Sequence, residues 1–296
     1  MSLDPDALRR ELIPLLWRHW TALGVTGWAD EEAQPVDPEA LIVLTARIDD
    51  LDARLRDCAT DWCIAFGASF VSETRLRHVI HEIARSDPRV DRFMATVAAN
   101  QGPAWASPIG GRTGYENRHK VHLTNLESSG RLVLRIRAVL GITARADVLA
   151  TLAGASEAMP MVEIERRTRY TRRAIDNAVG PLALAGVLAV TAVSVRDTRV
   201  SLIERSPFVD WLGHGPAMPD WVSRFDVILR VLALADALRG VPPPVVAIES
   251  RKAFGEMRAA IIRAGLPPPA DATGDAYVTS VDEWVSRLLV TFSPTI

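Results

Sequence analysis

Cysteine, lysine and long apolar runs are all scarce in this chain of 296 residues. Its two cysteines, Cys58 and Cys63, are too few for the disulfide framework of a small secreted domain, and we expect both to be buried. No uncharged apolar run reaches the ~20 residues that a membrane-spanning helix needs. The acidic N-terminal residues lack the basic-then-apolar order of a signal peptide. These absences predict a cytoplasmic protein that does not enter a membrane.

The overall composition is that of a globular protein. Hydrophobic residues make up 48% of the chain and charged residues 24%, which excludes global disorder. The formal net charge is −2 at pH 7, so the charge of the whole chain neither favours nor excludes a nucleic-acid partner. At this length we expect two domains, or one domain with appended segments.

Helical periodicity dominates the chain and predicts a mostly α-helical fold. Asp-Pro pairs at residues 4–5, 37–38 and 87–88 predict helix starts, because aspartate is a good N-cap and the first helical position tolerates proline. Apolar residues at helical spacing follow each pair, so residues 1–100 are predicted to form a helical bundle. Residues 101–130 are rich in turn signals and predict a linker. Residues 214–296 are predicted to form a C-terminal helical region.

The predicted elements of residues 131–213 follow the order of a winged helix-turn-helix domain. Two segments of helical periodicity precede a short helix at 161–168, a tight turn at Arg169 and Tyr170, and a second short helix from Thr171. The apolar period then changes to two on either side of a polar tip at 196–199, which is typical of a β-hairpin. Because Pro181 falls in the second short helix, that helix should either bend there or end at Val179.

The second short helix carries side chains that suit DNA bases. Arg172, Arg173, Asp176 and Asn177 are expected on its outer face, near the N-terminus, where a recognition helix contacts base edges. Arginine can donate a bidentate pair to guanine, and asparagine can pair in the same way with adenine. Three alternatives remain for Asp176: it could accept from cytosine, repel phosphate, or form an ion pair with Arg172 or Arg173.

Four further residues are expected to contact the DNA backbone. Tyr170 and Thr171 could reach phosphate oxygens beside the helix N-terminus, and Arg196 and Arg199 could do so from the hairpin tip. The charge distribution agrees, since residues 131–205 hold 12 arginines and seven acidic residues, a net charge of +5. A local basic excess in an acidic chain is expected of a DNA-binding module.

The segment that contains the motif residues 163–188 resembles winged-helix transcriptional regulators of the ArsR/MarR type. The resemblance covers about 75 residues and is carried by Glu163, Ile164, Thr168, Arg169, Tyr170, Thr171, Ala174, Ile175, Asn177, Ala178, Leu182 and the run AGVL at 185–188. It implies sequence-specific binding to double-stranded DNA. The common use of this fold further implies palindromic recognition by a homodimer.

A longer resemblance covers most of the chain. It links the sequence to a poorly characterised bacterial family of helical proteins with a central winged helix, whose genes often lie beside nucleotidyltransferase-like genes. It is carried by PEAL at residues 38–41, RIRAVLG at 135–141, ARA at 144–146 and GDAY at 274–277. Because winged helices also serve in protein contact, this resemblance leaves an alternative: a protein-interaction or antitoxin-like accessory subunit of a partner enzyme encoded nearby.

An enzyme or a metal site has the least support. His78 and His81, and likewise His119 and His122, are three residues apart and could place two ligands on one helix face. A zinc site needs three or four ligands, and no cysteine pair or His-Glu-x-x-His run completes one. We also find no nucleophile elbow and no persuasive carboxylate pair. We therefore expect no catalytic residues, no metal and no cofactor.

Overall fold

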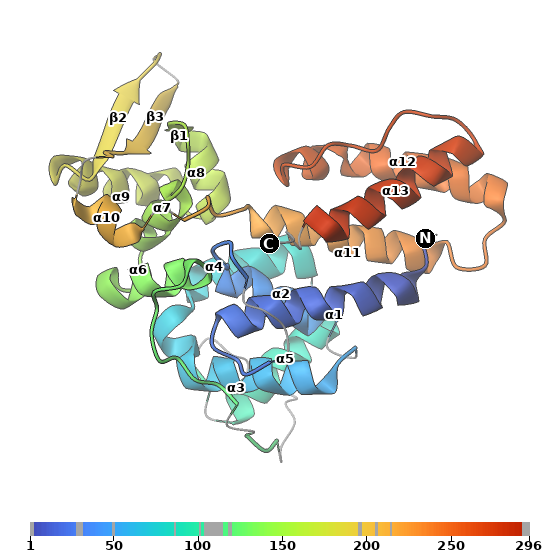
Figure 1. The fold of residues 1–296 in the computed structure, drawn as a ribbon, viewed down its shortest axis with the longest axis horizontal. Helices are drawn as coiled ribbons and strands as arrows, with labels where there is room; N and C mark the ends of the chain where they lie inside the picture. Colours follow the sequence, from blue (N-terminus) through green and yellow to red (C-terminus); the bar gives the residue numbers. More distant parts are fainter. Residues whose placement is uncertain are drawn as a thin grey trace. The chain divides into compact units, whose positions relative to one another are not determined.

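The computed structural model describes residues 3–27, 32–48, 51–85, 87–100, 102–103, 115–117, 120–194, 197–204, 207–213 and 215–291. Over these ranges the chain is mostly helical, as predicted, with one small three-stranded antiparallel sheet (Figure 1). It divides into two compact units, one of Met1–Trp17, Asp50–Asp52 and Asp220–Ile296, the other of Arg18–Asp49 and Ala53–Pro219. These units group the chain differently from the four predicted segments, whose boundaries stay predictions.

In its described residues, the smaller unit consists of four helical segments. They are the first part of α1 (Pro5–Ala22), then α11 (Trp221–Ala237), α12 (Pro243–Arg263) and α13 (Asp275–Thr291). Asp220 caps α11 by accepting from the backbone N–H of Ser223. Phe254 and Trp284 join α12 and α13 through an edge-to-face contact, with ring centroids 5.2 Å apart. These contacts give the predicted C-terminal helices a core of their own.

The larger unit begins with a helical bundle whose starts follow the predicted caps. Its elements are α2 (Pro38–Arg47), α3 (Ala53–Phe70), α4 (Glu73–Val79), the π-helix η1 (Ile80–Ala84) and α5 (Pro88–Ala99). The carboxylates of Asp37 and Asp87 accept backbone hydrogen bonds at the starts of α2 and α5. Trp20 and Trp62 meet edge to face in the core of this bundle, and Cys58 and Cys63 are both buried, as predicted.

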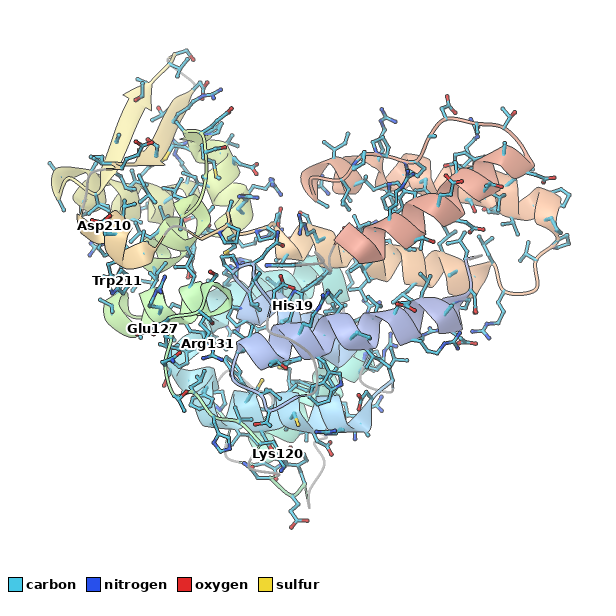
Figure 2. The ribbon with its side chains drawn as sticks, viewed as in Figure 1. His19, Lys120, Glu127, Arg131, Asp210 and Trp211 are labelled. Atoms are coloured by element: carbon cyan, nitrogen blue, oxygen red, sulfur yellow. The ribbon has the colours of Figure 1, made fainter. Side chains whose placement is uncertain are left out.

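The predicted linker is described only in part, and some of its described residues contact the bundle. Val121 forms a β-bridge with Val25, and the Tyr115 hydroxyl lies 2.6 Å from a carboxylate oxygen of Asp61. Arg131, which is labelled in Figure 2, donates from Nε to the carbonyl of Ala22 at 2.6 Å. These long-range contacts hold the chain against the bundle before the next helices begin.

The rest of the larger unit carries the sheet. Its elements are η2 (Ser129–Arg131), α6 (Leu132–Leu140), α7 (Ala144–Leu152), β1 (Met159–Pro160), α8 (Met161–Thr168), α9 (Arg172–Leu184), β2 (Leu188–Ala192), β3 (Thr198–Leu202) and α10 (Pro207–Leu212). The strand order is β1-β3-β2, and Val200 of β3 pairs with Met159 on one side and Val190 on the other. Ile164, Ile175 and Val179 are buried in one core with Val200, which confirms the predicted packing between α8 and α9.

Two local predictions are settled by this arrangement. Helix α9 does not end at Val179, because it continues through Pro181 to Leu184. The predicted hairpin tip at 196–199 is wrong in its second half, since Thr198 and Arg199 belong to β3. Arg199 pairs with Thr191 in the ladder, and the turn closes earlier, where the carbonyl of Asp197 accepts from two backbone N–H groups.

Candidate nucleic-acid interface

The four predicted base-reading residues share one exposed side of α9. With 100° of rotation between successive residues, positions 172, 173, 176 and 177 lie on one face of the helix. Arg172, Arg173, Asp176 and Asn177 are all exposed in the structure. The opposite face is buried through Ile175, Ala178 and Val179. Thr171 begins the helix as its N-cap, and its hydroxyl oxygen accepts from the backbone N–H of Ala174 at 3.4 Å.

An ion pair lies across this exposed face. Arg172 Nε is 3.0 Å from a carboxylate oxygen of Asp176, one helical turn further along, and both side chains are about half exposed. Of the three alternatives for Asp176, the structure shows the ion pair, and the partner is Arg172. Arg173 and Asn177 form no side-chain hydrogen bond or ion pair with other residues that the structure describes. The two polar groups on this face that are open to a ligand are therefore Arg173 and Asn177.

The hairpin that follows α9 is also exposed. Arg199 is half-buried, and its Nε lies 3.3 Å from a carboxylate oxygen of Asp197. Residues 189–192 of β2 are exposed, because this edge strand extends beyond the core. Arg196 lies outside the described residues, so its predicted contact with DNA stays a prediction.

Tyr170 faces the helical bundle. Its hydroxyl lies 3.0 Å from the hydroxyl of Ser72, the N-cap of α4, and burial raises the pKa of Tyr170 to about 12. The tyrosine is therefore engaged within the chain, whereas we had expected it to contact a phosphate. The sequence could not indicate this, because its partner stands 98 residues earlier.

Buried charges connect the bundle to α6 and α7, and the sequence analysis missed them. Arg137 of α6 donates to Glu39 of α2 at 2.6 Å and to Asp147 of α7 at 2.8 Å. Arg75 of α4 donates to Glu39 at 2.5 Å and forms a second ion pair with Asp37. Glu39 also accepts from the backbone N–H of Ser72 at 2.6 Å. The network holds the helices that precede the sheet against the bundle.

A groove of about 870 Å³ lies between η1 and the turn that joins α8 to α9; we call it the η1–α9 groove. One wall is formed by His78, His81, Glu82 and Arg85, and the other by residues 165–166 and 169–171. Arg169 crosses the groove and donates to both carboxylate oxygens of Glu82, at 3.0 and 3.1 Å. The start of α9 therefore borders a polar groove whose opposite wall is formed by side chains of the bundle.

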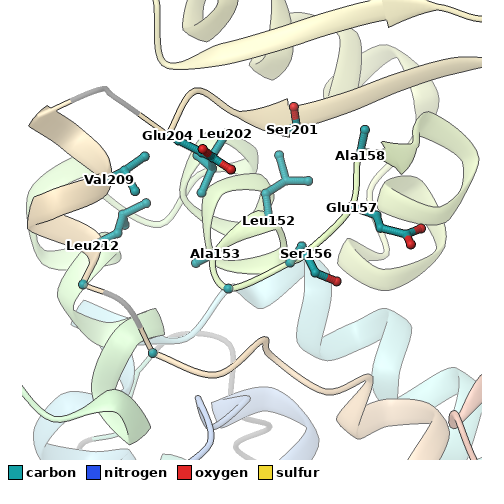
Figure 3. A pocket seen from close by; sticks show the side chains of 14 residues that line it. Leu152, Ala153, Ser156, Glu157, Ala158, Ser201, Leu202, Glu204, Val209 and Leu212 are labelled. Atoms are coloured by element: carbon teal, nitrogen blue, oxygen red, sulfur yellow. The ribbon is translucent and has the colours of Figure 1, made fainter.

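A smaller cavity, of about 390 Å³, lies between the α7–β1 loop, β3 and α10 (Figure 3). The charged side chains of its lining are Glu157 and Glu204, and two serines accompany them. Carboxylates repel phosphate oxygens, so this cavity adds nothing to a nucleic-acid interface.

A metal site finds no support in the ranges that the structure covers. Among these residues, no three His, Cys, Asp or Glu side chains lie close enough together to hold a metal ion. His119, half of the second histidine pair, lies outside them. No described helix is long and apolar enough to cross a membrane.

No family model, curated protein or solved structure matches this chain.

Proposed function

We propose that this chain binds double-stranded DNA in a sequence-specific manner through α9 and acts as a transcriptional regulator. The observation that carries the proposal is the capped N-terminal turn of α9, which exposes Arg172, Arg173, Asp176 and Asn177 together and packs on α8 through its other face. The element order supports it: α6, α7, β1, α8, α9 and a β2–β3 hairpin is the order of a winged helix-turn-helix.

The proposed contacts follow from the exposure and the ion pairing of each side chain. Arg173 and Asn177 would read base edges in the major groove, where a bidentate pair discriminates by about 1–3 kcal/mol against a wrong base. Arg172 would join them by exchanging Asp176 for a guanine or a phosphate. Thr171 at the helix start and Arg199 on β3 would position the DNA backbone. Two copies would bind half-sites about one helical turn of DNA apart.

The test is a binding measurement with the full chain. Fluorescence anisotropy would compare the DNA upstream of its own gene with a scrambled duplex, at two salt concentrations, for the wild type and an Arg172→Ala/Arg173→Ala variant. We expect a preference for the upstream duplex that the variant loses, at a cost of about 1–3 kcal/mol for each lost base contact.

A matched variant separates base reading from general charge. Arg258→Ala/Arg263→Ala removes two exposed arginines from α12, which belongs to the other compact unit. This variant should keep the preference for the upstream duplex. Equal affinity of the wild type for the two duplexes, or an equal loss in both variants, would contradict the proposal.

Exposed apolar side chains favour a second candidate function, contact with a protein partner. Leu184 at the end of α9 is 93% exposed, and Val190 and Val193 of the hairpin are also exposed. Exposed apolar side chains that gather into one patch are typical of interaction surfaces, and these three lie on α9 and on the hairpin that follows it. If this function is correct, Leu184→Asp should abolish co-purification of a partner encoded nearby, whereas Arg172→Ala/Arg173→Ala should leave it intact.

A further inference from the structure

We propose that the η1–α9 groove is a phosphate-binding site, in which Arg85 of the bundle and the N-terminus of α9 hold one phosphate group. Two sources could supply that group: a free phosphate monoester such as a nucleotide, or a phosphodiester of a DNA backbone. The proposal does not rest on base reading by α9, because the groove would bind the phosphate of either source by the same contacts.

The backbone of two arginines supports this assignment. Arg85 (φ 44°) and Arg169 (φ 60°) are the two non-glycine residues with a left-handed backbone in the part of the chain that the structure describes, and both line this groove. Each ends a helix, η1 or α8, at a position where glycine is the usual residue. Glycine would adopt these angles without the steric cost that a side chain brings. The chain therefore keeps two guanidinium groups where the backbone alone favours glycine.

Two features of the surrounding helices agree with a bound anion. The η1 segment is a π-helix, a rare form that often occurs at functional sites, and it carries His81 and Glu82 of the groove wall. Helix α9 begins at the opposite wall with Thr171, and the N-terminus of a helix carries about half a positive charge and unpaired backbone N–H groups. The ligand would thus meet positive charge from both walls.

The charges of the groove fit a single phosphate group. Arg169 is occupied by Glu82, and Arg166 is paired with Glu163 at 2.6 Å. Arg85 is exposed and forms no ion pair among the described residues. The lining holds three arginines and two glutamates, and once these two ion pairs are formed Glu165 is the lining carboxylate that remains beside Arg85. A single guanidinium group, that of Arg85, beside one helix N-terminus matches one phosphate better than a polyphosphate.

Arg85→Gly is the decisive variant, because it removes the guanidinium group and leaves a residue that favours the backbone angles found there. Thermal unfolding should therefore show a melting temperature equal to or above that of the wild type. A loss of binding in this variant cannot then be ascribed to misfolding.

The matched control is Arg77→Ala, which removes an exposed arginine that lies on α4 and does not line the groove. Calorimetric titration of the full chain with adenosine 5′-monophosphate, with adenosine as the phosphate-free reference, tests the free ligand. Anisotropy with a scrambled duplex tests the DNA backbone. We expect Arg85→Gly to weaken one of these two interactions about tenfold, as befits the loss of a charge-assisted hydrogen bond, and Arg77→Ala to leave both unchanged.

The outcomes separate the two sources. A loss confined to the nucleotide identifies a free phosphate monoester, and a loss confined to the duplex identifies a backbone phosphodiester. The proposal is overturned if neither probe binds the wild type, or if Arg85→Gly and Arg77→Ala behave alike with both. Failure of the proposed base reading by α9 can be told apart from failure of the phosphate site. It would show as equal affinity of the wild type for upstream and scrambled DNA.

Discussion

Arg137 on α6 and Glu39 on α2 form a buried ion pair, with Nη1 and Oε1 2.6 Å apart and neither side chain more than 1% exposed. The two residues are 98 positions apart in the chain. Arg137 also donates to Asp147 and to the carbonyl of Phe70, so its guanidinium group is held from several sides. Because charges removed from water are tolerated only when they are paired, these contacts fix α6 against the bundle.

Replacing Arg137 should strongly destabilise the protein. Arg137→Met removes a positive charge that pairs with the buried carboxylates of Glu39 and Asp147. We therefore expect the free energy of unfolding to fall by about 3–5 kcal/mol. The unfolding free energy of Arg137→Lys should lie between that of Arg137→Met and that of the wild type. An ammonium group lacks the planar guanidinium fork that reaches both carboxylates. Urea unfolding followed by tryptophan fluorescence measures these changes.

The control for this prediction is an exposed ion pair. Arg77→Ala breaks the pair with Glu73 on the surface of α4, where solvent screens the charges, and should cost about 0–1 kcal/mol. A similar cost for Arg137→Met would show that the buried network contributes little.

The network should also make stability depend on pH in the acid range. Burial alone would raise the pKa of Asp37, but the charge and hydrogen bonds of Arg75 lower it from 3.8 to about 2. A lowered pKa in the folded state adds stability above pH 3.8, and this contribution is lost as the pH falls towards 2. Its size is about 2 kcal/mol.

Asp37→Asn isolates this contribution, because asparagine is also a good N-cap and keeps the start of α2. The variant should be less stable than the wild type at pH 7, and the difference in unfolding free energy should shrink between pH 4 and pH 2. A difference that stays constant over this interval would refute the assignment to Asp37.

Removal of the Tyr170 hydroxyl separates its two possible roles. Since this hydroxyl is bonded to Ser72, we expect Tyr170→Phe to lower the unfolding free energy by about 0.5–1.5 kcal/mol and to leave DNA affinity unchanged. The opposite pattern, weaker DNA binding with unaltered stability, would restore the phosphate contact that the sequence analysis predicts. Urea unfolding and anisotropy on the same preparations decide between them.

Asp176→Asn should strengthen DNA binding. The substitution removes a negative charge from the exposed face of α9 and frees Arg172 from its ion pair. We expect higher affinity for upstream and scrambled duplexes alike, with a salt dependence steeper by about one released counterion. Glu73→Gln is the matched control, because it frees Arg77 from an exposed pair with the same spacing on α4. If both variants raise the affinity equally, the effect belongs to net charge and not to α9.

Local signals in the sequence were sufficient for much of the fold. The Asp-Pro caps at 37–38 and 87–88 place two helix starts correctly, because capping depends only on neighbouring residues. Apolar spacing predicts that Ile164 and Ile175 face each other, and the change of period predicts the hairpin. The exposed face of α9 follows from the same spacing, since the residues between the apolar positions must point outward.

Pro181 marks the limit of such signals. A proline inside a helix costs about 3 kcal/mol, and from the sequence a bend and an end are equally possible. The structure continues α9 to Leu184, and Leu182, beyond the proline, packs against the same core as Val179. Tertiary packing of the apolar face therefore decides where this helix ends.

The sequence by itself determined the order of α8, α9 and the hairpin, the helix caps at 37–38 and 87–88 and the polar face of α9, because each depends on residues within one or two turns of the chain. The tertiary structure alone decided that Glu39 meets Arg137, that Tyr170 binds Ser72, and that Arg85 and Arg169 share one groove. These partners stand more than 80 residues apart, and a single buried charge or hydroxyl leaves no periodic pattern. Only the packing of the bundle against α6 and against the α8–α9 turn brings them together.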